Sequence, residues 1–404
     1  MGQKELPNYK TEKQRWIVLV LFMFIAFMTQ INWITFAPIT DEVATYYNVS
    51  PNSVLLLAAV YMIAYLLVNF PATWAIDKYG LKWGTGIGVI LTGFFGFLRA
   101  FSGDSFSFLM FAQIMTAIGQ PFVLNSFTKV SINWFPENEK TTATGLGTIS
   151  ILLGVVMGMI ATPYLYEKQG IDFILWLYGI LSLIAMVLYL FIVQNNPKSP
   201  PSAAAGTKVF DFKGLMKLFK VRDFNILLIL VFIGLGSFNA LLSDIDNIFI
   251  RFNSNTQAAG LIAATMIFGG ILGAGILSTY SDKVHKRKIF LVIAMLASIP
   301  LTVLLDITAN LNQTLLISFI FGFFLVSALP ISLIYAAEIT YPITEEASNG
   351  LMMTLGQLAG IIFLISFNMY VLTILFLIGF ALSLIMNDVT IDDANIEGSQ
   401  IVSD

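Results

Sequence analysis

Long uninterrupted apolar stretches are the feature that most constrains how this chain can fold. A helix needs about 20 mainly apolar residues to cross the hydrocarbon core of a bilayer. Twelve stretches of suitable length can be assigned, at 16–38, 53–76, 83–102, 105–129, 142–165, 172–193, 223–249, 257–280, 288–306, 312–336, 346–367 and 369–387. Their continuous hydrophobicity predicts helices, because strands of a membrane β-barrel alternate apolar and polar residues over about ten positions. The sequence therefore predicts an all-α membrane protein with twelve transmembrane helices.

Composition excludes several other classes of protein. Only 11% of the 404 residues are charged, against about 25% in a soluble domain. The chain has no cysteine and a single histidine, His285, which leaves little scope for a metal cluster or a Ser-His-Asp site. No phosphate-binding glycine loop and no basic arm are visible. We therefore expect no enzymatic activity, no metal, no cofactor and no nucleic-acid partner.

Two polar motifs recur at one spacing. Residues 77–82, a charged turn between two apolar stretches, have a counterpart 205 residues later at 282–287. Residues 135–146 carry a Phe-Pro pair, Glu139 and Gly145-Leu146, and a similar pattern starts 206 residues later at Tyr341. A shared spacing of half the chain length indicates an internal duplication. We expect two pseudo-symmetric six-helix halves, 1–193 and 223–387, a cytoplasmic linker at 194–222 and a disordered cytoplasmic tail at 388–404.

Lysine and arginine predict the orientation. With both termini in the cytoplasm, 18 of the 21 basic residues lie inside, and Arg99, Lys168 and Arg251 fall at or near the outer ends. This distribution is the one that the positive-inside rule favours. The first apolar stretch is long enough to span a membrane and so is not expected to be a cleavable signal. We expect a multi-pass monomer in the plasma membrane.

The paired turns carry a family signature. The first turn resembles the loop between helices 2 and 3 of the major facilitator superfamily, Gly-x-x-x-Asp-(Arg/Lys)-x-Gly-(Arg/Lys)-(Arg/Lys). The residues that match in the two copies are Asp77, Lys78, Gly80 and Lys82, and Asp282, Lys283, Lys286 and Arg287. Thr73 and Leu81 depart in the first copy, and Ser278 and His285 in the second. The resemblance covers both halves and implies the fold of that superfamily.

These turns are candidate gates. An aspartate at a cytoplasmic helix end can accept hydrogen bonds from the N-terminus of a neighbouring helix. Lys78 and Lys82 can pair with acids such as Glu137 or Glu139, so that the contacts form in one state and break in the other. The alternative is that basic turns only hold the loop in the cytoplasm. That alternative does not require an aspartate at the same place in both copies.

Glycines at four-residue spacing suggest close helix contacts. Gly154 and Gly158 correspond to Gly356 and Gly360 in the other half, and the apolar stretch 257–280 carries four more glycines. Small residues at this spacing let helix backbones approach each other in lipid. Their symmetric placement suggests the interface on which the halves rock, whereas each glycine taken singly is explained by plain close packing.

Polar side chains at mid-membrane depth are candidates for substrate binding, because they are costly unless they face a cavity or one another. The alternative for any single Asn, Gln or Tyr is an interhelical hydrogen bond. Asp244 nears the outer interface, where we expect it to be wet. The candidates are Gln30, Asn32, Trp33, Tyr61, Tyr65, Gln120, Asn239, Asp244 and Gln357.

Three local patterns resemble a narrower group, the feline leukaemia virus subgroup C receptor family. They lie at 32–37, at 120–124, and at 349–351 with Gln357 and Gly360. The resemblance implies transport of choline, ethanolamine or haem, with Trp33 and Gln357 lining a central cavity. Two positions depart, since Asn239 replaces a cavity tyrosine and Leu152 replaces a glutamine.

A secondary or facilitative transporter that moves a small organic solute, such as a choline-like amine, by alternating access is the leading hypothesis. Two alternatives stay open: proton-coupled multidrug or metabolite efflux, and a non-transporting receptor or sensor. The expected partners are a small-molecule substrate and the lipid bilayer, with a coupling proton or ion as a further candidate. The apolar stretches at 16–38 and 105–129 contain no acid that could relay a proton, and no large soluble sensing region is present.

The predicted topology can be tested by labelling, because the chain contains no native cysteine. Ser199→Cys lies in the predicted cytoplasmic linker and Ser254→Cys in a predicted outer loop. In intact cells, an impermeant thiol reagent should label the second variant and not the first. Equal labelling of both variants from the outside would contradict the topology.

Overall fold

The computed structural model describes residues 13–197, 215–252, 257–284, 286–341, 343, 345–366 and 368–387. Within these ranges the chain is helical and contains no strand. Most of the predicted linker and all of the predicted tail lie outside the described residues, as do His285 and Pro342. The all-α expectation is confirmed for the described part of the chain.

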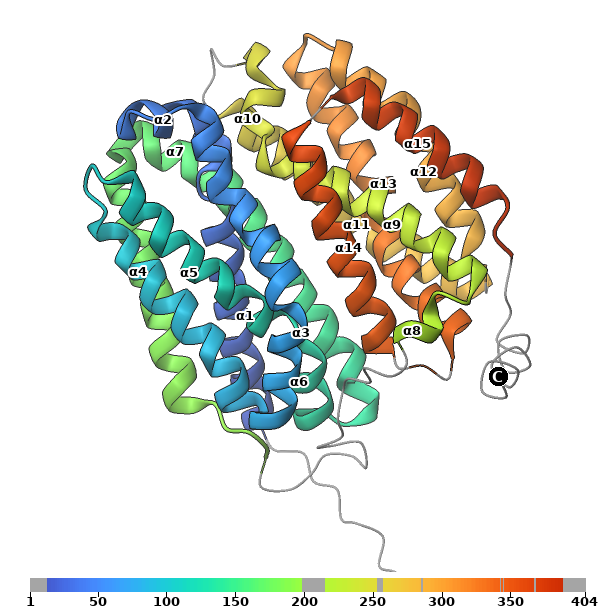
Figure 1. Ribbon diagram of the computed structural model, residues 1–404, viewed down its shortest axis with the longest axis horizontal. Coiled ribbons are helices and arrows are strands. Elements are labelled where there is room, and N and C mark those ends of the chain that lie inside the picture. Colours follow the sequence, from blue (N-terminus) through green and yellow to red (C-terminus); the bar gives the residue numbers. More distant parts are fainter. Residues whose placement is uncertain are drawn as a thin grey trace, which may run out of the picture.

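Two groups of helices lie side by side (Figure 1). The first group contains α1 Gln14–Ile34, η1 Ala37–Ile39, α2 Thr40–Tyr47, α3 Pro51–Ile90, η2 Leu91–Phe95, α4 Gly96–Leu98, η3 Arg99–Phe101, α5 Phe106–Leu124, α6 Phe127–Trp134 and α7 Glu137–Ile192. The second contains α8 Leu215–Leu218, α9 Arg222–Ser243, α10 Ile245–Ile248, η4 Ile250–Phe252, α11 Ala258–Val284, α12 Lys288–Ile307, α13 Leu311–Thr340, α14 Glu345–Ile365 and α15 Met369–Leu384. The groups are called the N half and the C half below.

Helices α3 and α7 are too long for one crossing. They have 40 and 56 residues, or about 60 and 84 Å at 1.5 Å per residue, against a hydrocarbon core of about 30 Å. Each is interrupted by a glycine with non-helical angles, Gly80 at φ 79° and Gly170 at φ 75°. Glycine occupies this region without the steric cost that a Cβ atom brings. Each element therefore consists of two helices joined at a glycine.

Nine helical segments in the described ranges are long and apolar enough to cross a membrane, and Met369–Leu384 is a shorter apolar helix. Two of the nine are long segments: Pro51–Phe101 includes α3, and Thr142–Ile192 is most of α7. The count of twelve passes stays a prediction. The predicted stretch 223–249 is shorter in the structure, because α9 ends at Ser243 and Asp244 leaves helical geometry with φ −120° and ψ 26°.

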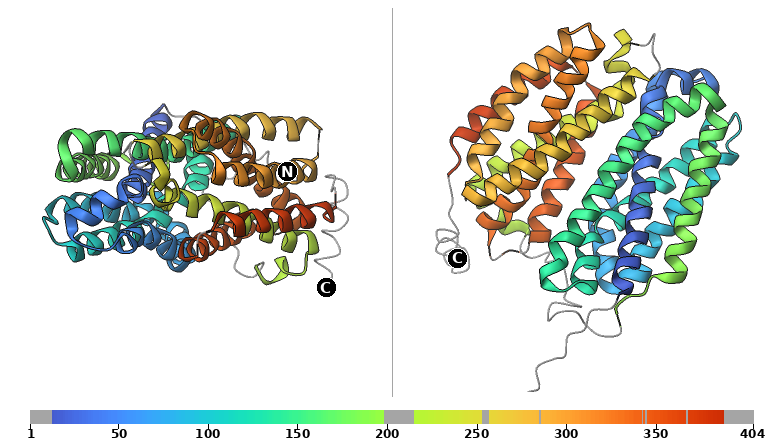
Figure 2. Two further views of the ribbon diagram at one scale, coloured as in Figure 1. Left: turned by 90° about the horizontal axis from the view of Figure 1, so that it is seen from above. Right: turned by 180° about the vertical axis from the view of Figure 1, so that it is seen from behind.

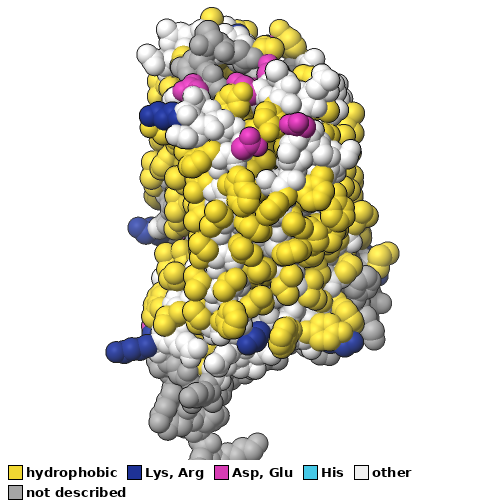
Figure 3. Space-filling view, turned by 90° about the vertical axis from the view of Figure 1, so that its left-hand side faces the viewer, with side chains coloured by type: hydrophobic (Ala, Val, Ile, Leu, Met, Phe, Trp, Pro, Cys, Tyr) yellow, Lys and Arg dark blue, Asp and Glu magenta, His cyan; other side chains and the backbone are white. Residues whose placement is uncertain are grey.

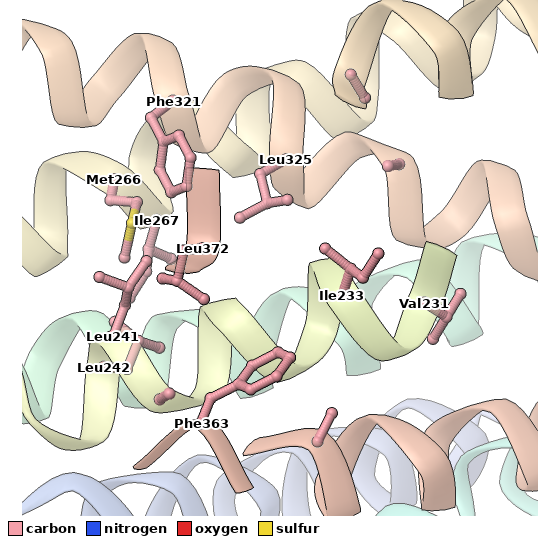
Figure 4. Close-up of a cluster of buried hydrophobic side chains, with 14 of the residues drawn as sticks. Val231, Ile233, Leu241, Leu242, Met266, Ile267, Phe321, Leu325, Phe363 and Leu372 are labelled. Carbon is pink, nitrogen blue, oxygen red and sulfur yellow. The ribbon is translucent and has the colours of Figure 1, made fainter. Parts of the chain in front are cut away.

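The core of the C half surrounds α9. Figure 4 shows Leu241 and Leu242 on α9 facing Met266 and Ile267 on α11, with Leu372 of α15 between them. Phe363 of α14 lies on the other side of α9 in the same cluster. Because lipid tails are as apolar as these side chains, the gain comes from close packing and not from leaving water. The helix that carries Asn239 is thereby fixed on several sides.

Most of the glycines pack helices within one half. The backbone of α11 touches that of α13, where Gly273 lies against the carbonyl of Phe323 and Gly322 against the carbonyl of Met266. Gly154 and Gly158 pack α7 against α1 in the N half. The hypothesis that these glycines form a rocking interface between the halves is therefore wrong for them. They stiffen each half internally.

Two helix pairs join the halves. Helix α7 packs on α11, and α3 packs on α14; Figures 1 and 2 show these pairs from opposite sides. Gly260 of α11 lies against Met159 and Pro163 of α7, and Gly360 of α14 lies against Met62 of α3. Among the glycines of the described residues, these two make close approaches between the halves. The candidate residues on α1, α3 and α14 are placed near this junction.

The surface fits a membrane protein. On the face shown in Figure 3, hydrophobic side chains cover the middle, while acidic side chains gather toward the upper end and basic ones mainly toward the lower end. Exposed apolar side chains such as Leu67, Trp74 and Phe191 would be costly in water. A lipid belt would cover them.

The contact between α11 and α13 gives a matched pair of variants. A Cβ at Gly273 would collide with the Phe323 backbone, whereas a Cβ at Gly275 meets nothing within 4 Å. Gly273→Ala should destabilise the protein by about 1–3 kcal/mol through overpacking. Gly275→Ala should be neutral or slightly stabilising, because alanine favours a helix. The temperature at which the detergent-solubilised protein loses its monodisperse elution peak measures both; equal values would contradict the tight contact.

Candidate functional site

Trp33 lies in a buried cluster that joins the two halves. The cluster contains Trp33 of α1 and Tyr61 of α3 together with side chains of α9, α11, α13 and α14. The Trp33 side chain is 8% exposed, and its Nε1–H has no hydrogen-bond partner among the described residues. An indole N–H normally finds a partner when it is buried. The structure thus places an unsatisfied donor at the junction of the halves.

Gln357 faces another amide. Asn239 Nδ2 of α9 donates to Gln357 Oε1 of α14 at 3.2 Å. Less than one turn beyond Gln357, Gly360 lies against both Asn239 and Met62 of the N half. The amide pair is therefore held at the edge of the contact between α14 and α3. Asn239, which departs from the family pattern, is the residue that positions Gln357.

The two tyrosines of α3 bond within the N half. Tyr61 and Thr116 share a hydrogen bond of 2.8 Å between their hydroxyl groups, and the Tyr65 hydroxyl donates to Asn125 Oδ1 at 3.0 Å. These contacts agree with the alternative of interhelical hydrogen bonds for both residues. The Tyr61 hydroxyl is thus occupied within the N half, and the ring of Tyr61 lies in the same cluster as Trp33.

A polar chain crosses from α3 to α14. Asn125 Nδ2 donates to Asn69 Oδ1 at 2.6 Å, and Asn69 Nδ2 donates to Thr354 Oγ1 at 2.7 Å. Asn69 lies nearer the Tyr79 end of its helix, which is the predicted cytoplasmic end. This network is one of the direct hydrogen-bond links between the halves.

Arg99 is a buried residue whose role sequence reasoning missed. It was expected near the outer surface, yet its side chain is fully buried. Arg99 Nη1 donates to the Asn32 carbonyl at 3.2 Å and to Gln113 Oε1 at 3.0 Å, while Nη2 bonds Asn32 Oδ1. An arginine inside an apolar stretch was the available signal, because such charges mark functional or structural networks.

The Arg99 network determines the role of Asn32. Gln113 Nε2 also donates to the Asn32 carbonyl at 3.1 Å, and Asn32 Nδ2 donates to Ser182 Oγ at 3.2 Å. Arg99 and Gln113 thus occupy the Asn32 carbonyl, which would otherwise accept the next backbone hydrogen bond of α1. Helix α1 ends two residues later, at Ile34. Asn32 thus has structural partners and holds the neighbouring Trp33 in place. Gln30 and Gln120 are buried, and Gln30 touches Gly154 of α7.

Asp244 is buried, and the expectation that it would be wet is wrong. It follows the last residue of α9, and its Oδ1 accepts a hydrogen bond from Asn247 Nδ2 at 2.7 Å. Burial raises the pKa of this carboxyl from its ordinary value to about 6, although the Asn247 hydrogen bond opposes the rise. Asp244 lies beyond the membrane-spanning part of α9, and its hydrogen-bond partner Asn247 belongs to the same half.

The first cytoplasmic turn pairs differently from expectation. Lys129 Nζ of α6 forms an ion pair with Asp77 Oδ1 of α3 at 2.7 Å, and both side chains are largely buried. Lys78 Nζ lies 4.6 Å from the centroid of the Trp74 ring. Glu139 pairs with Arg15 at 2.9 Å, so the predicted pairing of Lys78 or Lys82 with Glu139 is wrong. The side chain of Glu137 lies outside the described part.

Gly80 and Lys82 anchor this turn to the end of the N half. The Lys82 backbone N–H donates to Asn195 Oδ1 at 2.7 Å, and a Cβ at Gly80 would lie 2.7 Å from the same oxygen. Gly80 is therefore required both by its positive φ and by the approach of Asn195. The signature glycine has a direct steric explanation.

The second turn is centred on Arg287. Its Nη1 forms an ion pair with Asp282, and its Nη2 lies 3.0 Å from Glu338 Oε1 of α13. Among the described residues, neither Lys283 nor Lys286 forms an ion pair with Asp282. Ser281 Oγ accepts from Arg287 Nη1 at 3.1 Å and donates to the Lys286 carbonyl at 2.9 Å. In both copies, the ion pairs of the described residues tie helices within one half.

Comparison with known proteins identifies the family. Residues 22–364 match the family model of the Major Facilitator Superfamily. Solute carrier family 49 member A3 of Xenopus tropicalis is 30% identical over 381 residues, which cover 89% of this chain and 79% of that protein. The choline/ethanolamine transporter FLVCR2 of Rattus norvegicus is 29% identical over 385 residues, covering 90% of this chain and 70% of that protein.

A solved structure shows the same fold. It is the crystal structure of a bacterial homologue of the human lysosomal transporter Spinster, in an inward-facing and unoccupied conformation. The TM-score is 0.69 at 15% sequence identity, and the match covers 97% of each chain. The resemblance to the feline leukaemia virus subgroup C receptor family is supported by the named relatives. The chain belongs to the major facilitator superfamily and is a membrane transporter, not an enzyme.

Proposed function

We propose that this transporter moves a small organic cation, such as a choline-like amine, by alternating access of a site between its halves. It would cross the plasma membrane twelve times, with both termini in the cytoplasm. The observation that carries the proposal is the buried, unpartnered indole of Trp33 at the junction of the halves. A buried donor without a partner is costly, and a bound solute with an oxygen acceptor would satisfy it.

The charge distribution favours a cation held without a carboxylate. Helices α1 and α5 contain no acid, and the acids of α14 are its first two residues. A cation at mid-depth would therefore be held by ring faces and amide oxygens. The face of an indole attracts an organic cation by about 0.5–2 kcal/mol. The rings of Trp33 and Tyr61 and the oxygen of Gln357 are the groups that we assign to this site.

Relatives support the same chemical class. FLVCR2 of Rattus norvegicus and of Homo sapiens are both named choline/ethanolamine transporters. Both solutes combine a cationic nitrogen with a hydroxyl group. The nitrogen suits a ring face, and the hydroxyl oxygen suits the Trp33 N–H. The ring face and the N–H group of the proposed site thus correspond to the cationic end and the hydroxyl end of such a solute.

Binding can be tested with three solutes on purified protein. Choline should raise the unfolding temperature, because a ligand that binds the folded state stabilises it. Tetramethylammonium, which lacks the hydroxyl, should do so more weakly. The uncharged choline analogue with carbon in place of the quaternary nitrogen should have no effect. A shift as large with the uncharged analogue as with choline would contradict a cation site.

Substitution of Trp33 separates its two roles. Trp33→Leu should weaken choline binding by about 2- to 30-fold through loss of the cation–π attraction. Trp33→Phe keeps a ring face and should retain tetramethylammonium binding, while it loses the preference for choline that the N–H provides. Titration by thermal shift measures each affinity. Equal affinities of the leucine and phenylalanine variants for tetramethylammonium would exclude the ring face as the cation site.

Gating at the cytoplasmic turns is a second element of the proposal. Asp77→Asn removes a largely buried ion pair with Lys129 and should slow transport more than it weakens binding. Asp282→Asn should have a smaller effect, because the Asp282 side chain is 55% exposed and Arg287 keeps Glu338. Choline uptake by proteoliposomes and thermal-shift affinity measure the two quantities. A loss of affinity with unchanged turnover would argue against gating.

A further inference from the structure

An acid of the C half bonds a helix N-terminus of the N half. The Thr40 backbone N–H donates to Asp246 Oδ2 at 3.1 Å. Thr40 is the first residue of α2, and Asp246 lies on α10, just beyond the outer end of α9. The first N–H groups of a helix have no partner within the helix, and a carboxylate is favourable there. This contact joins the outer ends of the two halves.

The contact is a buried one. The Asp246 side chain is 7% exposed, and α10 packs against η1, α2, α9 and α11. An outward opening that separates η1 and α2 from α10 would break the hydrogen bond and expose the carboxyl to water. The environment of Asp246 therefore depends on whether the outer ends are together or apart.

The charged groups around Asp246 are all acidic. Helix α2 contributes Asp41 and Glu42, and Asp244 stands at the end of α9. Neither η1 nor the first turns of α11 carry a charged side chain. The guanidinium of Arg251 bonds the Thr308 carbonyl at 3.0 Å, and Asp246 has no ion pair among the described residues. Within the described ranges, no cation offsets the carboxylate.

These surroundings favour the protonated form while the outer ends are together. Burial raises the pKa of Asp246 from its ordinary value of 3.8 to about 7, and Glu42 and Asp41 add to the rise. Backbone hydrogen bonds from Asp41 and Thr40 act in the opposite direction. In water, with the outer ends apart, burial no longer acts and the pKa falls back toward its ordinary value.

We propose that Asp246 is a proton-binding site whose occupancy is coupled to closure of the outer side. The carboxylate takes one proton from the outer solution as α10 meets α2, and the carboxyl returns it when they part. Its carbonyl oxygen can still accept the Thr40 N–H while protonated. This inference rests on the alternating-access function proposed above, to which it adds a proton as a linked ligand.

The sign of the pH effect follows from linkage. The state with the higher pKa binds more protons, so that acid favours it. As the pH falls through the window from about 7 to 3.8, the ratio of closed to open outer ends should rise by up to about tenfold per pH unit. Above this window, the buried carboxylate disfavours closure. An acidic outer solution would therefore promote closing of the outer gate.

A distance measurement tests this directly. The chain has no native cysteine, so spin labels can be attached at Asn52→Cys and Ala309→Cys, which are exposed at the outer ends of the N half and the C half. Electron–electron distances would be measured on the full chain in lipid nanodiscs at pH 5 and pH 8. We expect the fraction of molecules with a short distance between the two labels, which have the outer ends together, to be larger at pH 5 than at pH 8. An unchanged distribution would overturn the proposal.

Three variants identify the group that titrates. Asp246→Asn mimics the protonated carboxyl and should give the short-distance population at both pH values. Asp244→Asn removes another buried outer acid, one that bonds Asn247 in its own half, and should retain the pH response. Glu42→Gln removes a neighbouring negative charge and should move the midpoint to lower pH. A response that persists in Asp246→Asn, or that disappears in Asp244→Asn, would contradict the assignment.

The test does not depend on the identity of the solute. The labelled protein should respond to pH even if choline is not transported, since no substrate is added. Failure of choline to bind would overturn the proposed solute and leave the distance result intact. A pH-independent distance with normal choline uptake would overturn only the proton site.

Discussion

Lipid offers no hydrogen-bond partners to the polar groups of a membrane-spanning helix, and the fold depends on how these groups satisfy one another. Arg99 is the most demanding case, because a fully buried guanidinium must use its donors within the protein. It does so on the carbonyl and side chain of Asn32 and on Gln113. These bonds fix the end of α1. The position of Trp33 follows from them.

Rigid halves joined by few polar links suit the proposed mechanism. Within each half, glycines bring backbones into contact, as at Gly273 and Phe323, and such contacts leave little room for internal adjustment. Among the described residues, the hydrogen bonds between the halves lie toward the two ends, where Asn69 bonds Gly350 and Thr354 at one end and the pairs Thr40–Asp246 and Gln257–Glu167 lie at the other. A rocking motion of the two halves would therefore break only a few hydrogen bonds, first at one end and then at the other. Alternating access requires such a motion.

The two cytoplasmic turns show how a duplicated motif can keep its form and change its partners. Asp77 uses a lysine from α6, whereas Asp282 uses Arg287 from its own turn, with Glu338 as a second acid. In both turns the result is an ion pair that links helices of the same half. Arg287, which matches the family signature, supplies in the second turn the basic partner that Lys129 of α6 supplies in the first.

The sequence by itself determined the class of protein, the apolar helices and the paired turns, because hydrophobicity and motif spacing are local properties of the chain. It also predicted polar candidates at depth, among them Trp33 and Gln357. Only the tertiary structure decided which side chains meet. Arg99 bonds Asn32 across 67 residues, Lys129 bonds Asp77 across 52, and Thr40 bonds Asp246 across 206. Such partners depend on how helices pack, and no local pattern encodes the energy of those distant contacts.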